Sequence, residues 1–143
     1  MIKRIVLLSI FMYVGPVFSK GICDVSEVKY QEAFNEYREN GSVSFIRTML
    51  EGGKFSSDEK ALNQSEHFQR IESSFGDVGT TSVIIKKSLG DRSCFISSIL
   101  EYELGPVFMS LMYYKTSKEI IVSSFSFQTE AEVILSSNVL FQD

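Results

Sequence analysis

Apolar residues in the first half of the chain recur three and four positions apart, which is the spacing of one face of an α-helix. This pattern predicts an amphipathic helix over residues 24–40, which ends where Gly41 supplies a helix stop. A shorter second helix is predicted over 42–51, and a third over 58–75 with Ser57 as its N-cap. The first half of the chain is therefore expected to be helical.

After Gly79 the apolar period changes from 3.6 to 2, and β-branched and aromatic residues become frequent. Four strands are predicted, at about 80–89, 93–102, 107–115 and 119–128. Each connection is short enough for a hairpin, so neighbouring strands are expected to pair antiparallel. A last turn or two of helix is predicted over 129–135. The predicted fold class is α+β, with three N-terminal helices packed on a curved four-stranded antiparallel meander.

The second strand shows which of its faces should turn toward the helices. Glu101 and Glu103 share one face, which is expected to point outward, and Tyr102 lies on the opposite, inward face. The third strand is apolar on both faces, and strict alternation in the fourth puts Phe125 on one side and Val122 on the other. Helices can cover only one face, so we expect a partner subunit or another segment on the outer face.

The centre of that outer apolar surface depends on the strand register, because a slip of one residue exchanges the two faces. One register centres it on Met109, Leu111 and Tyr113. The alternative register centres it on the opposite set, which includes Phe108 and Met112.

The run YELGPVFMSLMYYKTSKEIIVSSFSF, residues 102–127, resembles the sheet of the nuclear transport factor 2-like superfamily, in particular of its small bacterial periplasmic members. The shared features are a Gly-Pro turn, an aromatic strand ending in Tyr-Tyr-Lys, and a short polar turn before an apolar strand. The chain departs from the family pattern at Glu119-Ile120, where those members often carry Gly-Trp. The resemblance implies a cone-shaped domain with a cavity between sheet and helices and frequent dimerisation, but no single function.

Residues 1–19 have the layout of a secretory signal peptide. Lys3 and Arg4 precede an uncharged apolar run over 5–18, which at roughly 14 residues is shorter than the about 20 that span a bilayer. Cleavage is predicted between Ser19 and Lys20, which leaves one domain over 20–143 in the periplasm or outside the cell.

Charge and cysteine content narrow the partners and the compartment further. Removal of 1–19 takes away two basic residues and no acidic one, which moves the formal charge from −4 to −6. An acidic chain without a basic cluster is a poor ligand for nucleic acid or anionic membrane surfaces, so neither is expected as a partner. Cys23 and Cys94 are the two cysteines, and in an oxidising compartment a bridge between them is favoured over two free thiols.

Candidate chemistry in the sequence is sparse. Tyr102 could donate to an oxyanion but would need a base beside it, and a core tyrosine is the favoured interpretation. The single histidine, His67, borders the apolar face of the third helix, where a half-exposed side chain is favoured over a catalytic base. One histidine and no paired cysteines offer no N/S metal site, and no cofactor motif is present. We assign no catalytic residue.

The most favoured hypothesis is an exported, non-enzymatic protein that holds a small apolar ligand in the cone. The residues predicted to line such a cavity are Tyr102, Phe108, Ser110, Met112 and Phe125. The alternative is a protein-interaction module, either a homodimer scaffold or an inhibitor or immunity-type partner, that uses the outer sheet face. An isomerase-like or hydrolase-like enzyme is favoured least. A hollow cone would favour the first, a filled cone with an apolar outer face the second, and a buried carboxylate beside Tyr102 the third.

Overall fold

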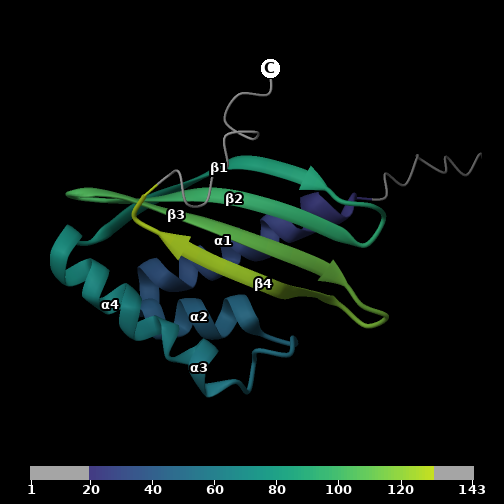
Figure 1. Ribbon diagram of the computed structural model, residues 1–143, viewed down its shortest axis with the longest axis horizontal. Helices are drawn as coiled ribbons and strands as arrows, with labels where there is room; N and C mark the ends of the chain where they lie inside the picture. The colour runs from purple at the N-terminus through teal and green to yellow at the C-terminus, as the bar shows by residue number, and fades with distance from the viewer. Residues whose placement is uncertain (1–19, 131–143) are drawn as a thin grey trace, which may run out of the picture.

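The computed structural model describes residues 20–130 and confirms the predicted α+β class (Figure 1). The helical half contains α1 (Ile22–Asn40), α2 (Ser42–Leu50), α3 (Glu59–Leu62) and α4 (Gln64–Phe75). The second half contains β1 (Val78–Ser88), β2 (Ser93–Tyr102), β3 (Gly105–Lys115) and β4 (Ile120–Gln128). The helices form one layer and the sheet the other.

The predicted third helix is present as two pieces, α3 and α4, which are separated at Asn63. Its predicted N-cap at Ser57 is wrong by one residue. Asp58 caps α3 instead, because its carboxylate accepts a hydrogen bond from the Ala61 N–H at 3.0 Å. An ionised cap of this kind satisfies one of the unpaired N–H groups at a helix start.

The four strands pair antiparallel in the order β1-β2-β3-β4, which confirms the predicted meander. The first and third strands begin two residues earlier than predicted, at Val78 and Gly105. Most of the helix predicted over 129–135, and the predicted signal peptide over 1–19, lie outside the described residues.

A bulge in β4 explains why its sequence is apolar at consecutive positions. Val122 pairs with Tyr113 and Ser124 with Met112, so Ser123 is an extra residue in this strand. The extra residue shifts the alternation, and the inner face therefore carries four apolar residues: Ile120, Val122, Phe125 and Phe127. The prediction that Val122 lies opposite to Phe125 is wrong for this reason.

The register of β3 is the alternative one. Met109, Leu111 and Tyr113 face the helices and are at most 2% exposed, so the prediction that they centre the outer surface is wrong. The outward residues of β3 include Phe108 and Met112, which are partly exposed.

Large side chains fill the space between the helices and the sheet. The Tyr37 ring stacks on Phe45 with centroids 4.9 Å apart, and Phe68 meets Phe45 edge-on at 5.3 Å. Tyr30 of α1 and Tyr113 of β3 are also buried between the helices and the sheet. This interior is a packed aromatic core, which corresponds to the filled cone among the sequence hypotheses.

The predicted Cys23–Cys94 disulfide is confirmed, with a Cα–Cα distance of 5.2 Å. It ties the first turn of α1 to the start of β2. Lys86 of β1 adds ion pairs to Asp24 and Glu27 of α1, at 3.1 and 2.7 Å. These links hold α1 against the β1 side of the sheet.

Candidate functional site

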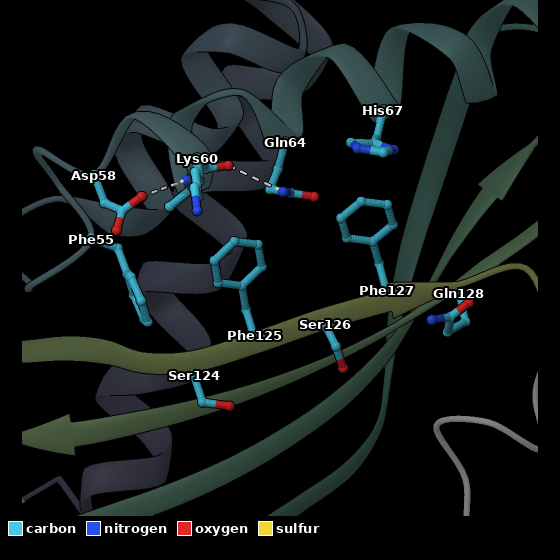
Figure 2. A pocket seen from close by; sticks show the side chains of 11 residues that line it. Phe55, Asp58, Lys60, Gln64, His67, Ser124, Phe125, Ser126, Phe127 and Gln128 are labelled. Atoms are coloured by element: carbon cyan, nitrogen blue, oxygen red, sulfur yellow. Dashed lines mark hydrogen bonds between the residues drawn. The ribbon is translucent and has the colours of Figure 1, made fainter.

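A surface depression lies between β4 and the segment that contains α3 and the start of α4 (Figure 2). We call it the β4 groove. It is open to solvent and has a volume of about 680 Å³, which lies within the usual range of ligand sites. Its lining residues include Phe55, Ala61, Gln64, His67, Phe125 and Phe127.

Aromatic side chains form the floor of the β4 groove. Figure 2 shows the rings of Phe125 and Phe127 turned from β4 toward the helices. Phe127 packs on Phe68 at 4.5 Å between centroids, and Phe125 meets Phe55 edge-on at 6.0 Å. Phe55, Phe125 and Phe127 are all only partly buried. The floor is therefore an ordered apolar surface that a ligand could cover.

Polar side chains from α3 and α4 form the opposite wall. Gln64 donates from its side-chain amide to the Lys60 carbonyl oxygen at 3.1 Å. The Lys60 ammonium makes no ion pair with any residue in the range 20–130. His67 accepts at Nδ1 from the Arg70 guanidinium at 2.9 Å, a partner that the sequence analysis did not name. The groove thus combines an apolar floor with a polar wall that carries one basic side chain, Lys60, and one acidic side chain, Asp58.

The structure does not bring the five predicted ligand-binding residues together. Tyr102 and Phe125 are on the inner face of the sheet, whereas Phe108, Ser110 and Met112 are on the outer face. Of the five, only Phe125 lines the β4 groove. Sequence reasoning missed the other residues that line the groove, because residues 60 to 70 positions apart meet there, such as His67 with Phe127 and Phe55 with Phe125. Phe127 could have been found from the sequence, because it lies two residues after Phe125 and therefore shares its face of β4.

Tyr102 is paired in the core. Its hydroxyl lies 2.8 Å from the Tyr37 hydroxyl, and burial raises the pKa of Tyr102 well above its usual range. The charge of the half-buried Glu72 also raises the pKa of Tyr102. The pKa of Tyr37 is raised most by its burial, next by the contact with Tyr102, and then by Glu72. Both phenols are neutral at physiological pH, and their mutual hydrogen bond supports the interpretation of Tyr102 as a core tyrosine.

The outer face of the sheet, which is turned away from the helices, is a second candidate surface. Its partly exposed apolar residues are Ile85, Phe95, Ile99, Phe108, Met112, Tyr114 and Ile121. A row of serines crosses the middle of this face, where the hydroxyls of Ser110 and Ser126 lie 2.8 Å apart. The outer face is therefore apolar but interrupted.

Residues 20–130 lack two further kinds of functional feature. No group of three or more His, Cys, Asp or Glu side chains there is arranged to hold a metal ion. No helix in the same range is long and apolar enough to cross a membrane.

No known family model matches the sequence, and no curated protein matches it either. The resemblance to the nuclear transport factor 2-like superfamily therefore stays a prediction.

Proposed function

We propose that the protein is an exported, non-enzymatic binding protein and that the β4 groove is its binding site for an apolar ligand. The observation that carries this proposal is the partly exposed aromatic floor, formed by Phe55, Phe125 and Phe127, inside an open groove of about 680 Å³. Because the core is packed, the proposed site is this groove at the sheet edge and not the predicted cone cavity. Covering such a floor is favourable by about 25 cal/mol for each Å² of apolar surface removed from water.

An apolar fluorescent probe tests this site. The Phe125→Ser variant is expected to bind 1-anilinonaphthalene-8-sulfonate roughly tenfold more weakly than the wild type, because one partly buried aromatic ring contributes about 1.4 kcal/mol. Fluorescence titration measures the affinity, and circular dichroism confirms that the variant is folded.

The matched control is Phe108→Ser, which removes an equal ring from the outer face. Its probe affinity is expected to stay at the wild-type value. Loss of affinity in Phe108→Ser, with none in Phe125→Ser, would place the apolar site on the outer face and contradict the proposal.

Export is part of the proposal and has its own measurement. The intact mass of the protein recovered from the periplasm or the medium is expected to correspond to residues 20–143 with both cysteines oxidised. The signal-peptide layout of residues 1–19 and the Cys23–Cys94 bridge support this expectation. A full-length chain retained in the membrane fraction would contradict cleavage after Ser19.

The second candidate function is protein interaction through the outer face, either with a second copy or with a different partner. It is favoured by the packed core together with the seven partly exposed apolar side chains on that face. Self-association is one way to cover such a surface, and a symmetric dimer is the commonest form. The variant that tests this candidate function is Met112→Arg, which places a charge on the outer face.

A further inference from the structure

We propose that the ligand of the β4 groove is an extended segment of a partner protein, which pairs with β4 as a fifth strand. This inference rests on the proposed function, since it names the class of ligand for the same groove. Such strand addition takes its affinity from main-chain hydrogen bonds and its specificity from alternate side chains.

The first observation is that the two edges of the sheet differ. Edge strands are normally protected from pairing by charged side chains, prolines or bulges. The β1 edge carries Lys86 and Lys87, and its pairing with β2 is irregular at two places. The nine residues of β4, Ile120–Gln128, contain no charged residue and no proline, and have one bulge, at Ser123. The start of the β4 edge is covered, because Gly53 packs against the backbone of Val122. The part from Ser124 to Gln128 borders the groove and lacks the charged side chains that β1 has.

The second observation is the position of the helices relative to β4. In Figure 1, α3 and α4 lie beyond the edge of β4. The β4 groove lies between this strand and the segment that contains α3 and the start of α4, and Phe127 contacts Phe68 of α4 at its floor. A strand added at the usual spacing of about 4.8 Å would lie beside β4, between this strand and the helices α3 and α4. Every second side chain of that strand would point into the groove, next to Phe125 and Phe127.

The same geometry favours a single extended segment over a second copy of this chain. A second copy that paired through β4 would bring its own α3 and α4 to the side of the sheet where these helices already project. An extended segment has no such layer, so its backbone can reach the β4 edge while its side chains fill the groove.

The side chains that line the groove indicate which side chains the partner segment should carry. The floor of the groove is uncharged, which suits apolar side chains at alternate positions of the segment. On the helix wall, the Asp58 carboxylate accepts the hydrogen bond that caps α3, while Lys60 forms no ion pair within residues 20–130. Arg70 beside His67 adds a second positive charge near this wall. Asp58 is acidic and lines the groove as well, so the wall is not uniformly basic. The segment is therefore expected to carry one carboxylate, placed opposite the Lys60 ammonium.

A random library of nine-residue peptides displayed on phage, selected on the folded protein, tests this proposal. The enriched peptides are expected to alternate apolar and polar residues and to contain an acidic residue. The best peptide is then synthesised in two backbone N-methylated forms, one methylated at odd positions and the other at even positions. Strand addition uses only one edge of the peptide, so one form should lose at least about tenfold in affinity and the other should bind like the parent.

A charge reversal tests the chemistry independently of the backbone. Lys60→Glu is expected to weaken the acidic peptide about tenfold, and selection on this variant is expected to enrich basic residues instead. Its matched control is Lys87→Glu on β1, which lies far from the groove and should leave the affinity unchanged.

Two results would overturn strand addition: both N-methylated forms binding like the parent peptide, or no peptide enriched above the level on a bare support. The fluorescent-probe titration tests separately whether the groove binds an apolar ligand. If the probe loses affinity in Phe125→Ser but the peptide results are negative, the groove binds an apolar ligand of another class and only the strand inference fails.

Discussion

Arginine in place of Leu111 is expected to leave no stably folded protein. Leu111 is 1% exposed on the inner face of β3, in the core between the sheet and the helices. The substitution removes its apolar burial and places an unpaired charge in the core, which together cost more than about 4 kcal/mol. Soluble yield, far-ultraviolet circular dichroism and urea unfolding measure the effect. A folded Leu111→Arg protein of wild-type stability would contradict the register of β3.

The neighbouring substitution, Met112→Arg, is the matched control. Met112 lies on the outer face, so the variant is expected to fold with a free energy of unfolding within about 1 kcal/mol of the wild type. If the outer face mediates a homodimer, light scattering at micromolar concentration should show a wild-type dimer and a Met112→Arg monomer. A monomeric wild type would remove the homodimer proposal, and an unfolded Met112→Arg protein would contradict the assignment of the outer face.

Reduction of the Cys23–Cys94 disulfide is expected to lower the free energy of unfolding by about 4 kcal/mol. The bridge joins residues 71 positions apart, so it restricts a large loop of the unfolded chain. For a domain of this size, such a loss lowers the unfolding midpoint temperature by about 15 °C. Thermal and urea unfolding with and without reductant measure the difference.

The double variant Cys23→Ala/Cys94→Ala controls for effects of the reductant. It is expected to unfold like the reduced wild type and to be insensitive to reductant. Alkylation of the native, unreduced protein should label neither sulfur. A change below about 1 kcal/mol on reduction would show that the bridge does not limit the unfolded chain as the loop model assumes.

Local patterns in the sequence were sufficient for the secondary structure and its order. The 3.6-residue period up to Phe75 predicts the helices, and the two-residue period after Gly79 predicts the strands. Each period is the interval at which side chains return to the same face of a helix or a strand. Short connections are enough to predict the meander, since a hairpin can join only antiparallel neighbours. The disulfide was also predictable, because two cysteines allow a single pairing.

The faces of the last two strands were not predictable from alternation. On β3 both faces are apolar, so the pattern does not distinguish Leu111 from Met112. On β4 the extra residue at Ser123 changes the alternation, and nothing in a single sequence marks a bulge at a serine. Only the pairing with neighbouring strands decides which side chains meet the helices.

The β4 groove depends on the tertiary structure in the same way. The sequence by itself determined the helical and strand segments, their order and the acidic, aromatic character of the chain. The tertiary structure decided that α3 and α4 lie beyond the β4 edge and that Phe55 meets Phe125. The physical reason is that periodicity records which side of its own backbone a residue occupies, whereas a binding site depends on the packing of segments far apart in the chain.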